Sequence, residues 1–593
     1  MIRAPSQGVP GILGELRMVP LDGRGAERLL VVARHLSLAR RCHGQNQNHV
    51  AVKWRATSAV EVVGVEVEEP PQGMEEAYAT LLTPAALQFV ARLTRQFNDK
   101  VDLMMNERMR RKVELDMTGS LPKFSNHPQA QAPDWKVDPA PRRLQDRRLD
   151  LGDVSPANTE HFVKALKCRV NGIQTDFDDG HCPTWLAQLR GLHNVYKVVH
   201  GLSGLGDIGS LPVLMLRPRA WNMIEHNMLV DGREVPGPLF DFGLLMFHCA
   251  GRLVEAESGP FFYLSKLEGA NEARLWDEIF CWTQDQLGIP RGTIKACVLI
   301  ENILASFEME EILYGLRHHS IGLNCGIWDY SASFVNKFGH RKDFILPDRN
   351  KYVNMQRHFL KSYMDLVIHT CHKRGAHATG GMAATILESI EDTNPVSQVT
   401  SGKARELMAG ADGFMVYDMR FVPIMEKFYK SFPFTNQINR LREDVRLTPH
   451  DLLEMPAGGV TLEGLKHNVA VGVLFIAAWL RGEGHYIYKG AVEDSATAEI
   501  SRSQVWQWIR HRASLEGSGE VITRQLVQSL IKDFISAASA TTAREEGKVA
   551  GERLAIAGEI FEEVVTKRDF PEFLTTYLNQ DHTFRAHQKR LSA

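Results

Sequence analysis

The middle of the chain alternates short runs of apolar residues with longer stretches in which apolar positions recur every three or four residues. Seven short runs stand out, at residues 172–177, 211–216, 261–264, 294–300, 321–325, 375–379 and 413–417. Strands separated by helices indicate a parallel sheet, and this many successive units favour a closed barrel over an open sheet. We therefore expect an α/β fold built on a (β/α)₈ TIM barrel, with its chemistry at the carboxyl ends of the strands.

The regions on either side of these runs have helical patterns. From residue 83 to 111 the apolar positions recur every three or four residues, which predicts an amphipathic helix, and the Pro-, Gln- and Asp-rich stretch 123–143 reads as a linker. After about residue 445 the strand pattern fades, and helices are predicted over 464–479, 503–511, 522–539, 543–565 and 571–578. Residues 1–60 have no sustained periodicity, and we expect a poorly ordered extension there.

Composition narrows the class of protein. The 593 residues are 44% hydrophobic and 24% charged, as in an ordinary globular chain with a large core. Because the formal net charge is only -2, no broad basic field exists to attract nucleic acid or an anionic membrane, and we expect neither as a partner. The longest clean apolar run, 469–480, is too short to span a bilayer. The pattern gives no indication of oligomeric state.

Cysteine usage and the two ends of the sequence bear on the compartment. Eight widely scattered cysteines without a C-x-x-C pair fit a reducing, intracellular environment. Arginines near the start resemble a transit peptide, but Glu15, Asp22 and Glu27 interrupt them, and such peptides are poor in acids. The final residues 590–593 do not form the Ser-Lys-Leu peroxisomal signal. We expect a soluble cytoplasmic or peroxisomal protein, with mitochondrial import as the less favoured alternative.

Charged residues that follow the apolar runs are candidates for the chemistry. Glu301 and Asp329 end two successive predicted strand regions, so a barrel would bring both carboxylates within reach of one Mg²⁺, which typically takes one or two carboxylates. The alternative is that both are helix caps or ion-pair partners. Arg217 follows a strongly apolar strand and could stabilise an oxyanion, or form a salt bridge at the rim. Asp494 precedes a helical stretch, where capping is the simpler explanation.

Longer motifs connect these residues to a known family. The segments Thr293-Ile-Lys-Ala-Cys-Val-Leu-Ile-Glu301, Phe307-Glu-Met-Glu-Glu-Ile-Leu-Tyr-Gly-Leu-Arg317 and Gly322-Leu-Asn-Cys-Gly-Ile-Trp-Asp-Tyr330 resemble the signature region of malate synthase. Four further segments match in order: Leu216-Arg-Pro-Arg219, Leu346-Pro-Asp-Arg349, Cys371-His-Lys-Arg-Gly-Ala-His-Ala-Thr-Gly-Gly-Met-Ala-Ala384 and Glu493-Asp-Ser-Ala-Thr-Ala-Glu-Ile-Ser-Arg502. The resemblance extends over roughly residues 143 to 578.

The resemblance implies the shorter, A-type form of the family: a TIM barrel with an N-terminal helical clasp and an all-helical C-terminal domain that closes over the site. The expected division is an extension (1–60), clasp and linker (61–142), barrel with the metal and substrate site (143–445), and a helical domain carrying the catalytic base (446–593). The implied reaction condenses acetyl-CoA with glyoxylate and hydrolyses malyl-CoA to malate and CoA, with Mg²⁺ as Lewis acid.

Residue roles follow from the motif positions. The resemblance implies Arg217 as the catalytic arginine that holds the enolate, and Asp494 as the base. It implies Glu301 and Asp329 as Mg²⁺ ligands. The implied substrate pocket consists of Arg217, Glu301, Gly326, Ile327, Trp328 and Asp329.

Two positions depart from the family pattern. The usual Asp-Phe-Glu-Asp strand end is here Asp176-Phe177-Asp178-Asp179, so Asp178 is one methylene shorter, and we expect Asp176 and Asp178 to support the metal site from behind its ligands. Met415 replaces a tryptophan that lines the substrate pocket, which leaves the choice of 2-oxo acid open. Two alternatives therefore remain: a related CoA-thioester enzyme that uses a larger 2-oxo acid, and a catalytically silent CoA-binding scaffold of the same fold.

Overall fold

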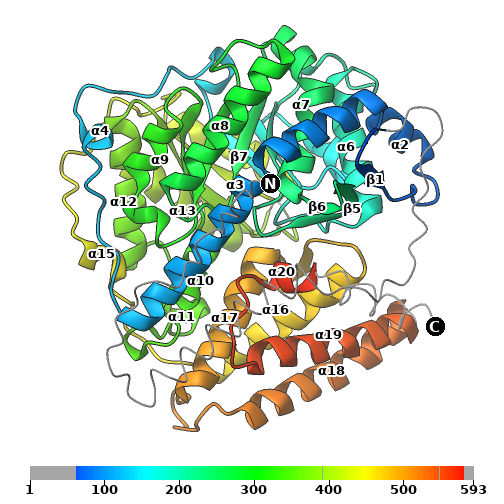
Figure 1. The fold of residues 1–593 in the computed structure, drawn as a ribbon. Helices are drawn as coiled ribbons and strands as arrows, with labels where there is room; N and C mark the ends of the chain where they lie inside the picture. The colour runs from blue at the N-terminus through cyan, green and yellow to red at the C-terminus, as the bar shows by residue number, and fades with distance from the viewer. Residues whose placement is uncertain (1–61, 390, 547, 580–593) are drawn as a thin grey trace, which may run out of the picture.

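A closed barrel of eight parallel strands forms the centre of the molecule (Figure 1). The computed structural model describes residues 62–389, 391–546 and 548–579. Around the barrel the strands follow in the order β10, β11, β2, β3, β4, β7, β8, β9. They are β2 (Leu149–Val154), β3 (Gly172–Asp176), β4 (Val213–Arg217), β7 (Phe261–Leu264), β8 (Lys295–Ile300), β9 (Ser320–Cys325), β10 (His377–Ala383) and β11 (Gly413–Val416). The predicted fold class is confirmed.

Seven of these strands correspond to the apolar runs, with ends shifted by a few residues. The eighth, β2, has the sequence Leu-Asp-Leu-Gly-Asp-Val, and every residue in it is buried. Its two aspartates and its glycine interrupt the apolar pattern, so the sequence does not reveal it as a strand. Both aspartates find partners inside the barrel: Asp150 pairs with Arg147, and Asp153 pairs with Arg217.

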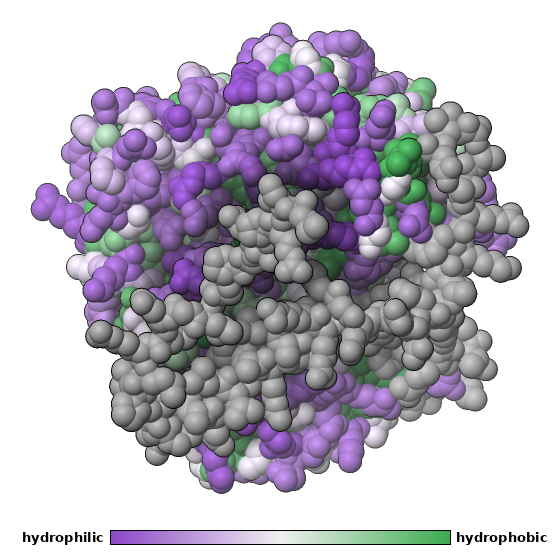
Figure 2. Space-filling view, in the orientation of Figure 1, coloured by the Kyte–Doolittle hydropathy of each residue, from purple (hydrophilic) through white to green (hydrophobic). Residues whose placement is uncertain are grey.

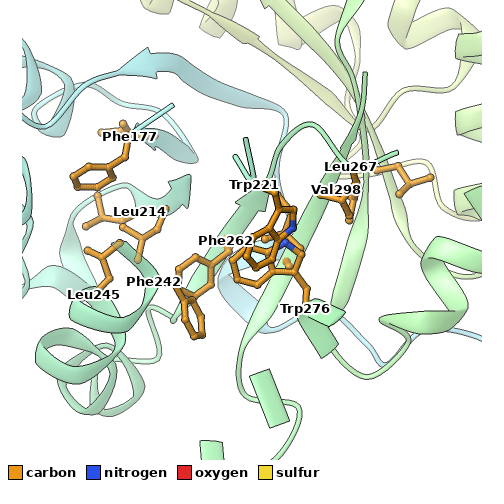
Figure 3. Close-up of a cluster of buried hydrophobic side chains, with 14 of the residues drawn as sticks. Phe177, Leu214, Trp221, Phe242, Leu245, Phe262, Leu267, Trp276 and Val298 are labelled. Atoms are coloured by element: carbon orange, nitrogen blue, oxygen red, sulfur yellow. The ribbon is translucent and has the colours of Figure 1, made fainter. Parts of the chain in front are cut away.

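Strand alternation divides the core into two layers. Along β4, Leu214 and Leu216 face outward into the main cluster, whereas Val213 and Met215 belong to a smaller cluster in the barrel interior. Large side chains such as Phe242 and Trp276 fill the outer layer (Figure 3). They lie between the strands and two helices, α7 (Gly237–Glu255) and α8 (Ala270–Leu287). This alternation fixes which residues at the strand ends point into the barrel mouth.

The remaining helices around the barrel are mostly those that connect its strands. They are α5 (Thr159–Leu166), α6 (Trp185–Val199), α9 (Met309–Gly315), α10 (Ile327–Phe338), α12 (His358–Lys373), α13 (Thr393–Ala409) and α14 (Val422–Phe428), with the short α4 (Pro128–Gln131), α11 (Arg349–Tyr352) and α15 (Pro449–Leu453). An excursion after β4 forms β5 (Ile224–Val230) and β6 (Arg233–Pro236), which join β1 (Val65–Val67) in a small antiparallel sheet. The sequence pattern does not predict this sheet.

The N-terminal part lies across the outside of the barrel. It consists of α2 (Glu75–Leu81) and the 35-residue α3 (Pro84–Thr118), drawn in blue in Figure 1. Thr83 caps α3 by accepting a hydrogen bond from the Ala86 N–H, and Pro84 occupies the first turn, where its missing N–H costs little. α3 packs against α7 and α8, as a clasp would.

The C-terminal part is a group of helices with its own core, seen below the barrel in orange and red in Figure 1. It contains α16 (Leu462–Leu480), α17 (Ser495–His511), α18 (Arg524–Glu546), α19 (Lys548–Thr566) and α20 (Leu574–Leu578). In addition to the predicted helices, it has a short hairpin of β12 (Tyr486–Tyr488) and β13 (Ala491–Glu493). α17 begins at residue 495, before the predicted 503, and packs against α10 of the barrel.

The surface and the boundaries complete the description. The coloured parts of the face shown in Figure 2 are mainly hydrophilic, with apolar residues in small groups. Within the described residues, no helix combines the length and the apolar character needed to cross a bilayer. The extension expected over 1–60 lies outside the described residues, and the proposed four-part division stays a prediction.

Candidate active site

The carboxyl ends of the strands bring the predicted metal ligands together. Glu301 comes directly after β8. It lies on the same side of the chain as the interior residues Cys297 and Leu299, so its side chain points into the barrel mouth. Asp329 lies in the first turn of α10, just after β9. Asp179, from the loop after β3, completes a buried group in which oxygens of the three carboxylates lie within 4.8 Å of one another.

Asp179 is not predicted as a candidate ligand from the sequence. It stands in the same acidic run as Asp176 and Asp178, but the pattern does not say which acid faces Glu301. Asp178 instead accepts hydrogen bonds from Lys266 Nζ (2.9 Å) and from the Ala220 N–H (3.1 Å). The shorter side chain at 178 is therefore held in place as a neighbour of the carboxylate group.

Arg217 lies at the centre of a buried ionic network. Its Nε and Nη2 bind both oxygens of Asp176 at 2.7 and 2.6 Å, its Nη1 binds Asp179 at 2.8 Å, and its Nη2 also binds Asp153 at 2.8 Å. Asp176 is itself fixed by backbone N–H groups of Asp178 and Gly180, at 2.7 and 2.6 Å. Asp176 thus orients the guanidinium.

Lys266 is a second buried cation, and it was not among the predicted site residues. Its Nζ lies 2.6 Å from Asp179, 2.9 Å from Asp178 and 3.4 Å from Asp329, while its backbone N–H donates to Glu301 at 2.6 Å. A positive φ of 54° gives the chain the turn after β7 that aims both groups at the acids. Nothing in the local sequence predicts that conformation.

The residues at the start of α10 shape one wall of the site. A Cβ on Gly326 would meet the Glu301 Cβ and Oε2, each at 3.1 Å, so only glycine leaves the carboxylate undisturbed. Ile327 and Trp328 form the first helical turn with Asp329, where backbone N–H groups favour an anion. Arg349 stacks 4.9 Å from the Trp328 ring.

Burial and charge shift the pKa values of these acids in opposite directions. Burial raises the pKa of Glu301 to about 7 and raises that of Asp329 well above its usual range. Burial would also raise the pKa of Asp179, but the charges of Lys266 and Arg217 outweigh it and lower that pKa. Burial, followed by the nearby charge of Asp494, raises the pKa of Asp153.

The charge balance indicates what the site can accept. The mouth gathers six carboxylates around the two cations Arg217 and Lys266. Five belong to buried residues, Asp153, Asp176, Asp179, Glu301 and Asp329, and the sixth is that of Asp178, whose side chain is 7% exposed. Within the described residues neither oxygen of Asp329 accepts a hydrogen bond, and its ion pair with Lys266 Nζ is long, at 3.4 Å. Buried carboxylates without donors are unfavourable unless a cation joins them, and oxygen ligands suit Mg²⁺. The residues present therefore fit a hard divalent cation.

Asp494 reaches the same site from the C-terminal part. It caps α17, where its side chain accepts from the Thr497 N–H and its own N–H donates to the Thr497 hydroxyl, both at 3.0 Å. The expectation of a cap is thus confirmed. The residue is only 8% exposed, its charge raises the pKa of Asp153, and the next residue, Ser495, donates from Oγ to Asp179 at 2.5 Å. A cap and a site residue are compatible here.

Met415 lies in β11 and is buried, with Met382 of β10 and Asp150 of β2 as its Cα neighbours in the barrel. Two positions further, the hydroxyl of Tyr417 lies 2.8 Å from His485 Nε2, and His485 donates from Nδ1 to the Gly180 carbonyl at 2.9 Å. These contacts join β11, the loop after β3 and the C-terminal part beside the acids.

A cavity of about 1000 Å³ opens between the barrel and the C-terminal part. One side is the loop after β3 with the start of α6, and the other is the segment from Trp479 to His485. Basic side chains on its walls include Arg190 and Arg481. Its lining includes Gly180, the residue that follows Asp179 in the sequence.

Comparison with known proteins identifies the family. Models described as the malate synthase N-terminal domain, TIM barrel domain and C-terminal region match residues 71–127, 213–455 and 459–581. A malate synthase from Myxococcus xanthus is 40% identical over 511 residues, which cover 84% of this chain and 93% of that protein. Malate synthases from Dictyostelium discoideum and Streptomyces clavuligerus are 38% and 40% identical, each over 84% of this chain and 94% of the relative. The resemblance seen in the motifs is confirmed, and the chain belongs to the malate synthase family.

Proposed function

We propose that this chain condenses acetyl-CoA with glyoxylate and hydrolyses the resulting malyl-CoA, with Mg²⁺ held by Asp179, Glu301 and Asp329. Family membership supports the reaction. The single observation that carries the residue assignment is the hydrogen bond from Ser495 to Asp179, because it holds the helix that Asp494 caps against the carboxylate group. A base and a metal site on separate parts of the chain are thereby brought to one place.

Mg²⁺, when bound, supplies Lewis-acid polarisation of the 2-oxo group. The chain itself provides the surroundings for the oxo acid. The first turn of α10, at Ile327 and Trp328, offers backbone N–H groups to the substrate carboxylate. Lys266 keeps part of the acidic charge neutralised, which limits repulsion of an anionic substrate.

Asp494 and Arg217 act on acetyl-CoA. The acetyl methyl is a very weak carbon acid, so it needs both a positioned base and immediate stabilisation of the enolate oxygen. Asp494 removes the proton. Arg217 has five N–H donors, of which four are engaged by Asp153, Asp176 and Asp179, and the remaining one on Nη1 is directed to the enolate.

Acetyl-CoA enters through the cavity between the barrel and the C-terminal part. Its volume of about 1000 Å³ suits a large cosubstrate, and the basic Arg190 and Arg481 suit phosphate groups. Because α17 carries Asp494 and contacts α10, approach of the C-terminal part assembles the base with the metal site and excludes water that would protonate the enolate.

Replacing Asp494 tests the assignment of the base. Asn is as good a helix cap as Asp, so Asp494→Asn keeps α17 capped but cannot accept the proton. We expect turnover, followed as thiol release from acetyl-CoA with glyoxylate, to fall by about 10² to 10⁴-fold with little change in melting temperature. Asp494→Ala is the control that loses the cap as well. Full activity of Asp494→Asn would overturn the proposal.

A panel of oxo acids tests the choice of substrate. Met415 is buried in β11, and a flexible thioether leaves more room than an aromatic ring would. Glyoxylate, pyruvate and 2-oxobutyrate are compared by kcat/KM. We expect glyoxylate to be preferred, and a preference for pyruvate would replace glyoxylate with a larger 2-oxo acid as the substrate. Binding of acetyl-CoA without turnover of any of the three would indicate a silent scaffold.

A further inference from the structure

A second cavity, far from the carboxylate group, is lined by basic residues. It has a volume of about 930 Å³ and lies at the amino-terminal ends of β2, β3 and β4, where Leu149, Asn171 and Val213 form part of its wall. The proposed active site is at the opposite ends of the same strands. We call this cavity the basic pocket; its charged lining residues are Arg143, Arg148, Lys167, Arg169, Lys430 and Glu426.

The charge of the basic pocket is locally unbalanced. Five cationic side chains line it against one carboxylate, although the whole chain has a formal net charge of only -2. Glu426 lies 3.8 Å from Arg169, and both side chains are well exposed, so this pair neutralises little. Arg148 is paired with Asp146 at 2.7 Å. Most of the positive charge is therefore left for an external anion.

The excess of positive charge in the basic pocket includes a half-buried residue, Arg143. Its guanidinium is half-buried and donates to neutral oxygens, the carbonyls of Ile208 and Leu211 and the hydroxyl of Ser258. No carboxylate pairs with it among the residues that the structure describes. A partly desolvated guanidinium held only by neutral acceptors keeps an unbalanced charge, which an anion in the cavity would compensate.

The dimensions and the walls indicate the kind of anion. A single inorganic phosphate would leave most of about 930 Å³ empty, whereas a nucleotide-sized molecule would fill it. Arginine forks and lysine ammonium groups together match several phosphate groups. Leu166, Leu211 and the ring of Tyr429 add apolar surface for an organic part.

We propose that the basic pocket binds a small organic polyphosphate, a molecule of nucleotide size with two or three phosphate groups. Lys167, Arg169 and Lys430, which are exposed at its rim, contact the outer phosphates. Arg143 holds the innermost phosphate from below. This site is separate from the cavity proposed for acetyl-CoA, and the proposal does not depend on the catalytic assignment.

The experiment measures binding of ATP, pyrophosphate, adenosine and citrate to the full chain by calorimetry. Because CoA contains an ADP portion and three phosphate groups, ATP could enter the acetyl-CoA cavity and CoA could enter the basic pocket. Every titration is therefore run both without CoA and with saturating CoA. We expect ATP to bind, pyrophosphate to bind more weakly, and adenosine not to bind. Added salt should weaken the ATP affinity, since exposed charges are screened. Citrate binding as tightly as ATP would overturn the proposal. Complete competition by CoA would also overturn it if Lys167→Gln with Lys430→Gln left the ATP affinity unchanged.

Paired variants assign the site. Lys167→Gln with Lys430→Gln removes two phosphate contacts, and we expect the ATP affinity to fall at least about tenfold. The matched control is Lys466→Gln with Lys532→Gln, two exposed lysines on α16 and α18, which should leave the affinity unchanged. Both double variants should keep the wild-type turnover without ATP. Equal ATP affinity in the two double variants would refute the basic pocket as the binding site.

Discussion

The two ends of the same three strands carry opposite excesses of charge. β2, β3 and β4 begin at the basic pocket, and Asp153, Asp176 and Arg217 lie four residues further along these strands, about 13 Å away. At the carboxyl ends six carboxylates, five of them from buried residues, surround two cations, whereas at the amino ends five cations face one carboxylate. The first excess suits a metal ion and the second suits a polyanion.

The two ends of these strands differ more in the burial of their charged groups than in the sign of the charge. The acids and cations of the carboxyl end are almost entirely removed from solvent, so each depends on its neighbours for compensation. At the amino end, Lys167, Arg169 and Lys430 are exposed, and water screens them. Removing one charge should therefore have a large effect at the carboxyl end and a small one at the amino end.

The largest effect is expected from Arg217→Gln. This change leaves Asp153, Asp176 and Asp179 without their shared partner, and breaking a buried ion pair costs about 3 to 5 kcal/mol of unfolding free energy. Loss of the enolate donor should lower kcat by about 10² to 10³-fold. Urea unfolding and thiol release measure the two effects.

Arg219 provides a matched control for that change. It is equally buried, and it pairs with Asp241 and Glu225, away from the carboxylate group. Arg219→Gln should lower stability to a similar extent while the folded enzyme keeps most of its turnover. Equal losses of kcat in both variants would mean that Arg217 acts only through the fold.

Neutralising Asp329 should separate stability from metal binding. Burial and the neighbouring acids outweigh the ion pair with Lys266 and raise the pKa of Asp329, so Asp329→Asn should stabilise the metal-free protein by about 1 kcal/mol. The same change should weaken Mg²⁺ binding by more than about 100-fold, because even changes behind the ligands cost 10 to 100-fold. Calorimetry with Mg²⁺ and thermal unfolding give the two values. Asp178→Asn, which spares the three carboxylates, should weaken Mg²⁺ binding less, by about 10 to 100-fold.

The barrel and the acidic carboxyl ends of its strands can be predicted from the sequence. Seven strands have apolar runs long enough to recognise, and Glu301 and Asp329 stand where barrel geometry must bring them together. β2 is not recognisable as a strand because its aspartates interrupt the apolar pattern. The cations that pair with them, Arg147 and Arg217, lie outside the strand. Lys266 joins the site through a turn with positive φ, and no residue pattern encodes that direction.

The basic pocket could not be predicted for a related reason. Lys167 and Arg169 are close in sequence, but Arg143 and Lys430 come from segments before β2 and after β11. Only closure of the barrel, which places β11 beside β2, brings these segments together. Charge clusters assembled across distant loops leave no periodic signal in a single sequence.

The pKa of Glu301 predicts how Mg²⁺ binding depends on pH. Burial raises this pKa from its ordinary value of 4.5 to about 7, and a metal ligand must be ionised. Protons therefore compete with Mg²⁺ below neutral pH, and the affinity should fall by up to about tenfold per pH unit as pH drops from about 7 to about 6. Calorimetry at several pH values measures this slope.

The metal-free protein should respond to pH in the opposite direction. Because the folded state holds a proton on Glu301 that the unfolded state has already lost, stability is fully present below about pH 4.5 and declines as pH rises through 7. Glu301→Gln removes this contribution, so the difference in stability between variant and wild type should grow with pH. An unchanged difference would place the titration on another group.

The smallest effect is expected at the amino ends of the strands. Lys167→Gln removes one exposed positive charge from five, and surface changes of this kind alter the unfolding free energy by only about 0.5 kcal/mol. Relief of repulsion makes the expected sign stabilising, and the gain should vanish in high salt, where exposed charges no longer sense one another. Thermal unfolding in low and high salt measures it. The contrast between the two ends rests on burial, rather than charge excess alone, setting the size of each effect. A loss of several kcal/mol of unfolding free energy in Lys167→Gln would contradict it, because it would show that the charges at the amino ends are as tightly coupled as those at the carboxyl ends.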